Sequence, residues 1–101
     1  MNTLGKELQE TINNLERIRD SQKTPSDDVI SNLDKLYEQR IDLIDAAIRK
    51  STDEYVKATN GMNQAAKKTK EAIDDLAKLE EAIKKVADAI GLVTELLSKV
   101  V

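Results

Sequence analysis

The side chains that most often carry out chemistry are scarce in this sequence. It contains no histidine and no cysteine, which removes the most common general base and the thiolate nucleophile. Carboxylates are plentiful and form three adjacent pairs, Asp27-Asp28, Asp74-Asp75 and Glu80-Glu81. Neighbouring residues on a helix point about 100° apart, so such a pair rarely makes one acid–base site. The sequence therefore predicts no enzyme, no catalytic residue, no metal site and no cofactor site.

The basic residues do not indicate a binding site for nucleic acid. The only cluster is Lys67-Lys68-x-Lys70, and no aromatic residue is interleaved with it. The formal net charge is −3, with both signs spread along the chain. A protein that binds a nucleic-acid duplex needs a basic face. We therefore expect no nucleic-acid partner and interpret the lysine cluster as a solvated helix face.

Composition points to a single all-helical domain over residues 1–101. Hydrophobic residues make up 40% of the 101 residues and charged residues 35%, with two tyrosines as the only aromatic side chains. The core must therefore be built from Leu, Ile, Val and Ala, as in helix-on-helix packing. One proline and three glycines leave few places to turn, which argues against a sheet protein.

The first helix is predicted over residues 3–21, where one apolar residue follows another at spacings of three and four. A second helix is predicted to start at residue 25, in Thr24-Pro25-Ser26-Asp27. Thr24 can cap it, Pro25 fits its first turn, and the Asp27 carboxylate can bond back to the cap amide. The similar spacing in Ser51-Thr52-Asp53-Glu54 is interpreted as a bend at most, because the apolar pattern continues through it.

A heptad pattern of apolar residues runs from Tyr37 to the end of the sequence. With Ile41 assigned to position a, only Ser51 and Thr69 are polar among the core positions. Position a holds Ile41, Ile48, Tyr55, Met62, Thr69, Leu76, Ile83, Ile90 and Leu97, and position d holds Tyr37, Ile44, Ser51, Ala58, Ala65, Ala72, Leu79, Val86, Val93 and Val100. A repeat of this length predicts coiled-coil-like packing of long helices.

The pair Asn60-Gly61 places two poor helix formers inside this pattern. Gly just after a helix end is the commonest stop signal, which favours a turn at residues 60–61. The heptad phase continues across the pair, so the alternative is one continuous helix from about residue 25 to residue 100 in a dimeric rod. We favour the turn because it brings Thr69 opposite Thr52 and beside Ser51, where their hydroxyls can satisfy one another.

The predicted architecture is an antiparallel long helical hairpin, with helices at about 25–59 and 62–100. The shorter helix at 3–21 completes a three-helix bundle at one end. The other end, near the turn, projects as a two-helix stalk that cannot bury all its apolar surface alone. We therefore expect the stalk to bind another helical protein or a second copy, as a homo- or hetero-oligomer. The expected partner-binding residues are Ile48, Tyr55, Met62, Thr69 and Ile73.

The function predicted from these features is a non-enzymatic helical protein–protein interaction module. It would serve as an adaptor or as a subunit of a larger bacterial assembly or secretion-related complex. In size and shape the predicted hairpin is similar to small secreted partners, export chaperones and needle-like subunits, although the Trp-x-Gly turn of one such family is missing beside Asn60-Gly61. The alternatives are a membrane-active or toxin-linked helical protein, and an immunity or inhibitor protein that binds one partner.

A membrane partner is not expected. No stretch of the sequence approaches 18 uncharged apolar residues, and the apolar segment near the end, at 83–101, lacks interfacial Trp and Phe. The polar start of the sequence has no apolar signal region. We expect a cytoplasmic protein, with export that uses no cleaved signal peptide left open.

Overall fold

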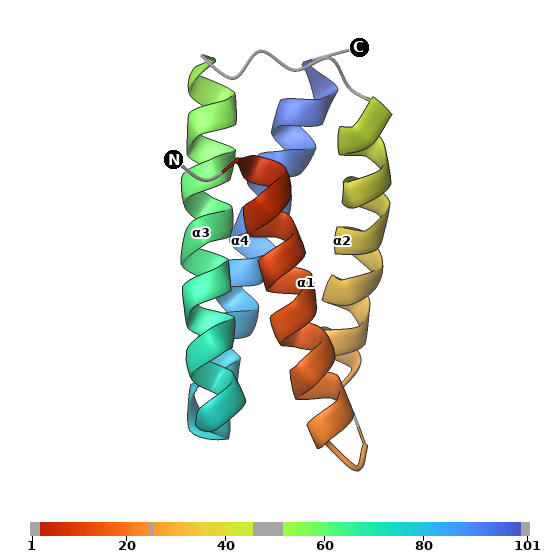
Figure 1. Cartoon of the computed structure of the whole chain (residues 1–101), viewed down its shortest axis with the longest axis vertical. Coiled ribbons are helices and arrows are strands. Elements are labelled where there is room, and N and C mark those ends of the chain that lie inside the picture. Colours follow the sequence, from red (N-terminus) through yellow and green to blue (C-terminus); the bar gives the residue numbers. More distant parts are fainter. Residues whose placement is uncertain (1–2, 25, 46–51, 100–101) are drawn as a thin grey trace.

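The chain folds into four α-helices and one short 3-10 helix in the computed structural model, which describes residues 3–24, 26–45 and 52–99 (Figure 1). The α-helices are α1 (Leu4–Ser21), α2 (Asp27–Asp45), α3 (Asp53–Asp74) and α4 (Leu79–Ser98). The 3-10 helix η1 (Leu76–Lys78) lies between α3 and α4. The prediction of an all-helical protein is confirmed for these residues.

The helix predicted at residues 3–21 is confirmed as α1. Thr3 caps it, because its Oγ1 accepts a hydrogen bond from the Lys6 amide at 3.2 Å. Its apolar stripe lies entirely in the core and consists of Leu4, Leu8, Ile12, Leu15 and Ile18. The spacing of these residues follows the helical period, so one face of α1 is apolar and the opposite face is free to be charged.

The cap of α2 is Ser26 and not the predicted Thr24. Ser26 Oγ accepts a hydrogen bond from the Val29 amide at 3.3 Å, and the helix begins at Asp27. Two carboxylates in the first turn, Asp27 and Asp28, favour this start because they face the positive end of the helix dipole. Residue 25 of the predicted capping motif lies outside the described residues.

The predicted second helix, at 25–59, is divided into α2 and α3. Thr52 caps the start of α3, since its Oγ1 accepts from the Tyr55 amide at 3.3 Å. The capping pattern that we interpreted as a bend is therefore a true helix start. Ser51 and the preceding residues 46–50 lie outside the described residues.

The turn predicted at Asn60-Gly61 is wrong, because both residues lie inside α3. Gly61 does not take a positive φ, and Ala58, Met62 and Ala65 remain in phase across the pair and fully buried. Burying the Met62 side chain contributes about 1.5–3 kcal/mol, which exceeds the cost of about 1 kcal/mol for Gly in a helix. The apolar period thus outweighs the local stop signal.

The chain reverses instead at Asp75, fifteen residues after Asn60. Asp75 Oδ1 accepts from the Ala77 amide at 3.1 Å, and the Asp75 carbonyl accepts from the Lys78 amide at 3.0 Å. These two bonds close the short η1 turn without glycine or proline. The reversal divides the predicted helix at 62–100, and it also makes the alternative of one continuous helix from 25 to 100 wrong.

The four α-helices occupy the corners of a square bundle, which replaces the predicted three-helix bundle and stalk. Consecutive helices run in opposite directions, and α2 and α3 lie at diagonal corners (Figure 1). Helix α1 packs against α2 and α3, and α4 packs against the same two helices. The side-by-side pairs α1–α3 and α2–α4 are therefore parallel, and the pairs α1–α2 and α3–α4 are antiparallel hairpins.

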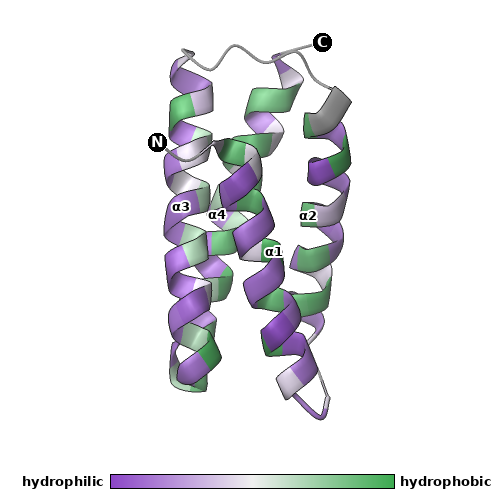
Figure 2. Cartoon of the chain, viewed as in Figure 1, coloured by the Kyte–Doolittle hydropathy of each residue, from purple (hydrophilic) through white to green (hydrophobic). Residues whose placement is uncertain are grey.

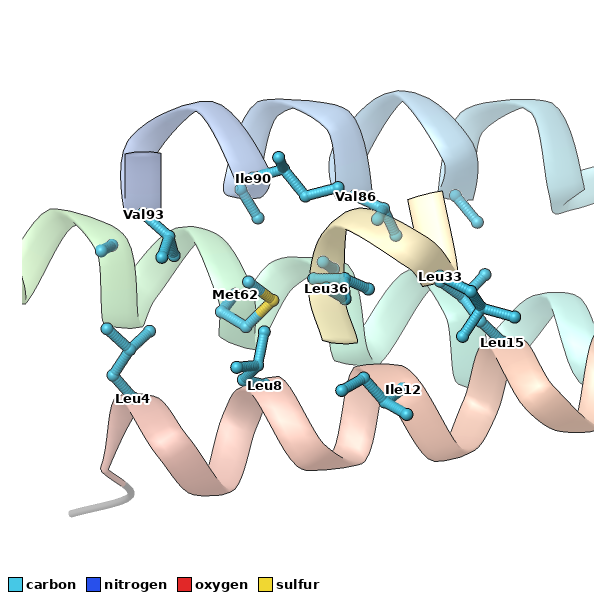
Figure 3. Close-up of a cluster of buried hydrophobic side chains, with 14 of the residues drawn as sticks. Leu4, Leu8, Ile12, Leu15, Leu33, Leu36, Met62, Val86, Ile90 and Val93 are labelled. Atoms are coloured by element: carbon cyan, nitrogen blue, oxygen red, sulfur yellow. The ribbon is translucent and has the colours of Figure 1, made fainter. Parts of the chain in front are cut away.

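The core runs along the axis of this bundle. Hydrophilic and hydrophobic residues alternate along each helix, so that one side can face inward (Figure 2). Side chains from all four helices point toward one another, among them Leu8, Leu36, Met62 and Val86 (Figure 3). The buried residues of α3 are mostly alanine, namely Ala58, Ala65, Ala66 and Ala72 beside Met62 and Thr69.

The heptad assignment holds for α3 and α4 and fails in α2 and η1. The positions a and d from Ala58 to Ala72 are buried in α3. In α2 and η1, two residues assigned to position a are exposed, Ile41 at 60% and Leu76 at 54%. The core face of α2 is formed by Val29, Leu33 and Leu36, which follow a different phase. The heptad frame therefore keeps its phase across the turn at Asp75 but does not extend back into α2.

Glycine-to-alanine substitutions test the helical placement of residues 61 and 91. A Cβ at Gly91 meets no atom within 4 Å, whereas a Cβ at Gly61 lies 2.6 Å from Leu92 Cδ1. We expect Gly91→Ala to raise the free energy of unfolding by about 0.5–1 kcal/mol in chemical denaturation, because alanine has the higher helix propensity. Gly61→Ala should give a smaller gain, because the end of the Leu92 side chain must move.

A turn at residue 61 predicts the opposite sign for the second variant. Alanine in a left-handed turn position would lower the free energy of unfolding by about 1 kcal/mol or more. A loss of that size in Gly61→Ala, with a gain in Gly91→Ala, would contradict the continuous α3.

Candidate protein-interaction surface

The residues predicted to bind a partner do not form an exposed surface. Met62 and Thr69 are fully buried, and Tyr55 and Ile73 are partly buried and pack against the core. Ile48 lies outside the described residues. In this fold the four described residues belong to the bundle interior and its margin. Their predicted role in partner binding has no exposed surface to support it here.

Tyr55 and Thr69 contribute to holding α1 against α3. The Leu4 amide, at the start of α1, donates a hydrogen bond to Tyr55 Oη at 3.1 Å. Asn14 Nδ2, farther along α1, donates to the Ala66 carbonyl at 3.0 Å and to Thr69 Oγ1 at 3.1 Å. The heptad interpretation expected Thr69 to pair with hydroxyls at 51 and 52, and its partner is instead an amide of α1.

A matching amide holds α2 against α4. Gln39 Nε2 donates to the Ile90 carbonyl at 2.9 Å and to Thr94 Oγ1 at 3.0 Å. In both parallel helix pairs, one side-chain amide of the first helix thus bonds a main-chain carbonyl and a threonine of the second. Buried donors need such partners, so these two contacts fix the register of the parallel pairs.

The outward face of α2 combines carboxylates with exposed isoleucines. We call this the α2 outer face and define it by Asp27, Ile30, Asp34, Glu38, Ile41 and Asp42, all of which are exposed. Ile30 is 41% exposed and Ile41 is 60% exposed. At about 100° per residue, Asp27, Asp34 and Glu38 lie opposite the core residues of α2. Ile30 and Ile41 lie together at one edge of this face, and Asp42 lies at the other edge.

The carboxylates of the α2 outer face have no charge partner within the part of the chain that the structure describes. The ion pairs there join residues of α1, α3 and α4 and the nearby Lys99. Asp34, Glu38 and Asp42 follow one another at spacings of four on the same helix. Like charges at this spacing repel one another and destabilise a helix.

The margin between α2 and α1 is held by polar contacts around Tyr37. Its hydroxyl donates to Glu16 Oε2 at 2.7 Å, and the Arg40 guanidinium lies 5.4 Å from the centre of its ring. Arg40 also donates to Gln9 Oε1 at 3.1 Å. Burial raises the pKa of the Tyr37 hydroxyl, and the bond to the Glu16 carboxylate raises it further.

A shallow hollow lies on the other flank of α2, against α4. It is lined by Lys35, Glu38, Gln39 and Asp42 of α2, together with Ile90, Thr94 and Leu97 of α4. Glu38 and Asp42 belong also to the α2 outer face. Gln39 is only 6% exposed, and its Oε1 has no hydrogen-bond partner in the described structure. The hollow therefore brings the exposed Glu38 and Asp42 carboxylates together, whereas the Gln39 amide oxygen is buried below the surface.

Other features of the sequence give no site. No group of three or more acidic residues that could hold a metal ion occurs among residues 3–24, 26–45 and 52–99. Lys68 of the basic cluster lies 3.3 Å from Glu81 and 3.7 Å from Glu71, and Lys67 and Lys70 are exposed. In the same ranges no helix is long and apolar enough to cross a membrane. The apolar face of α4 is buried in the bundle.

Met62 and Val56 provide a matched test of which α3 residues support the fold. Met62→Ala should lower the free energy of unfolding by about 2–5 kcal/mol, because it leaves a cavity in the core. Val56→Ala, at a side chain that is 47% exposed on the same helix, should change it by less than about 0.5 kcal/mol. Thermal and chemical denaturation measure both, and equal losses would contradict the placement of Met62 inside the bundle.

Tyr37 should make stability depend on alkaline pH. Its pKa is raised in the folded protein, so its contribution is complete below about pH 10 and is lost as pH rises through the folded pKa. Tyr37→Phe should lower the free energy of unfolding by about 1 kcal/mol at pH 7, where it loses the bond to Glu16. Between pH 9 and pH 11 the variant should lose less stability than the unchanged protein. Equal losses of stability in the two proteins over this pH range would show that folding does not raise the pKa of Tyr37.

No protein-family model, curated protein or solved structure matches this chain.

Proposed function

We propose that this chain is a non-enzymatic helical protein–protein interaction module that binds its partner through the α2 outer face. The observation that carries this proposal is the pair of exposed isoleucines, Ile30 and Ile41, among carboxylates that have no partner in the described structure. The module would act as an adaptor or as a subunit of a larger bacterial assembly. This surface replaces the stalk that the sequence predicted.

The two exposed isoleucines support binding because they lie on the same face of one helix. A single exposed isoleucine is ordinary on a soluble protein. Ile30 and Ile41 are separated by three helical turns on one face, roughly 16 Å apart along the axis at 1.5 Å per residue. Covering both removes apolar area from water at about 25 cal/mol per Å², which is the kind of gain that helix-to-helix recognition uses.

The rest of the bundle offers less to a partner. The large hydrophobic residues of α1 lie in the core. The exposed ones outside α2, in the described residues, are single ones on separate elements, Val56 on α3 and Leu76 in η1. Helix α4 buries Val86, Val93 and Leu96, so a role on a lipid surface would require α4 to leave the bundle. An immunity or inhibitor protein would be one particular case of a module that binds one partner.

A photo-reactive amino acid placed at single positions tests this proposal in the native cells. We expect a covalent adduct of discrete mass from position 41 on the α2 outer face. Position 56 on α3 is the matched control. Val56 is apolar and β-branched, as Ile41 is, and it is 47% exposed. Adducts are resolved by gel electrophoresis and identified by mass spectrometry.

The adduct from position 41 should disappear when Ile30 is changed to Ser, provided that circular dichroism shows unchanged helicity. Equal adduct yields from positions 41 and 56, or none from position 41, would argue against the α2 outer face as the binding surface.

A further inference from the structure

We infer that the partner of the α2 outer face is a cationic amphipathic helix of another protein, an inference that rests on the proposed function. Its apolar side chains would cover Ile30 and Ile41, and its lysine or arginine side chains would pair with Asp34, Glu38 and Asp42. The inference thus specifies which kinds of side chain the partner presents. It follows from the charge of the face, the hollow beside it and the spacing of the isoleucines.

The charge of α2 is one-sided on its exposed surface. Among residues 27–43 of α2, five carboxylates are exposed, Asp27, Asp28, Asp34, Glu38 and Asp42, and one base is exposed, Lys35. The other base of the helix, Arg40, is already engaged by the Tyr37 ring and by Gln9. A basic partner therefore meets little repulsion, and it relieves the repulsion among carboxylates at spacings of four.

The hollow between α2 and α4 brings two carboxylates together at one edge of this face. Glu38 and Asp42 line it, and both are exposed. The Gln39 amide is fixed by the Ile90 carbonyl and Thr94, and its Oε1 is buried out of reach of a partner. A primary ammonium supplies three N–H donors and one positive charge, which matches the two carboxylates.

The isoleucine spacing and the charge of the face favour a cationic helix over other kinds of partner. A spacing of eleven residues between Ile30 and Ile41 is a repeat of one face of an α-helix, so a second helix lying along α2 can present apolar residues at the same interval. Nucleic acids and anionic lipid surfaces carry the same sign of charge as this face and are disfavoured. A small polyamine would pair with the carboxylates but leave both isoleucines in water.

An 18-residue synthetic peptide of leucine and lysine in an amphipathic helical pattern is the probe. The matched peptide carries glutamate in place of every lysine. We expect the lysine peptide alone to bind the full chain in isothermal titration, with amide shifts in ¹⁵N-resolved spectra confined to α2 and the adjoining side of α4. Binding should weaken as salt is raised from low to physiological concentration, because exposed ion pairs are screened.

A variant pair of equal charge separates the α2 outer face from general attraction to an acidic protein. Glu38→Gln with Asp42→Asn should weaken binding of the lysine peptide by about three- to tenfold. The control, Glu10→Gln with Asp88→Asn, removes two exposed carboxylates from α1 and α4 and should leave binding unchanged. Equal effects of the two pairs would overturn the inference.

A third peptide tests the N–H donors at the hollow. Replacing lysine by trimethyl-lysine keeps the charge and removes every side-chain N–H donor, so binding should weaken because the charge-assisted hydrogen bonds to Glu38 and Asp42 are lost. Equal affinity of the two peptides would overturn the role of the hollow. A dimeric mass in sedimentation that is lost in the Glu38 and Asp42 variant would instead assign the surface to a second copy of the chain and overturn a heterologous partner.

The failure of this inference is distinguishable from the failure of the proposed function. An adduct at position 41 in cells, together with no preference for the lysine peptide over the glutamate peptide, leaves the interaction module standing and overturns the cationic helix. The absence of any adduct removes the module's binding surface and with it the basis of the inference.

Discussion

The small side chains on the inner face of α3 are the constraint on which the arrangement of the other helices depends. Ala58, Ala65 and Ala72 are fully buried, and Gly61 leaves room for Leu92 of α4. Such residues let neighbouring helices approach closely, so α3 packs against α1 and α4 at once, while the larger Leu and Ile residues of α1 fill the axis. The large side chains of α1 thus fill most of the core, and the small side chains of α3 let α1 and α4 approach it closely. Helix α2 completes the square by covering the remaining side.

The sequence predicted the helical class and one complete helix, and it failed at the connections for identifiable reasons. The stripe from Leu4 to Ile18 is regular and lies entirely in the core, so α1 was predictable. The reversal at Asp75 was not, because its η1 turn uses an aspartate side chain and neither glycine nor proline. At Asn60-Gly61 the opposite error occurred, since a strong local stop signal lies where burial of Met62 keeps the helix intact. An unbroken heptad phase concealed both the cap at Thr52 and the turn at Asp75.

The predicted binding residues were chosen on the basis of the same predicted turn. Without the stalk, Met62 and Thr69 become core residues and Tyr55 becomes a partner of the first amide of α1. A signal for the α2 outer face was present in the sequence, because Val29, Leu33 and Leu36 define a helical face that excludes Ile30 and Ile41. The heptad frame, extended back from α3 into α2, assigned Ile41 to the core and concealed that signal. Exposed apolar residues can be recognised only after the phase of each helix is known separately.

A shared register in the two parallel pairs relates the two hairpins of the molecule. The bonds from Leu4 to Tyr55, from Thr11 to Met62 and from Gln39 to Ile90 each span 51 residues. The α1–α2 hairpin therefore lies beside the α3–α4 hairpin with one constant offset, and neither hairpin covers its own apolar face. The same interface can form when the first half of one chain meets the second half of another. Exchange of halves would double the mass and leave the helical content unchanged, which sedimentation together with circular dichroism can detect.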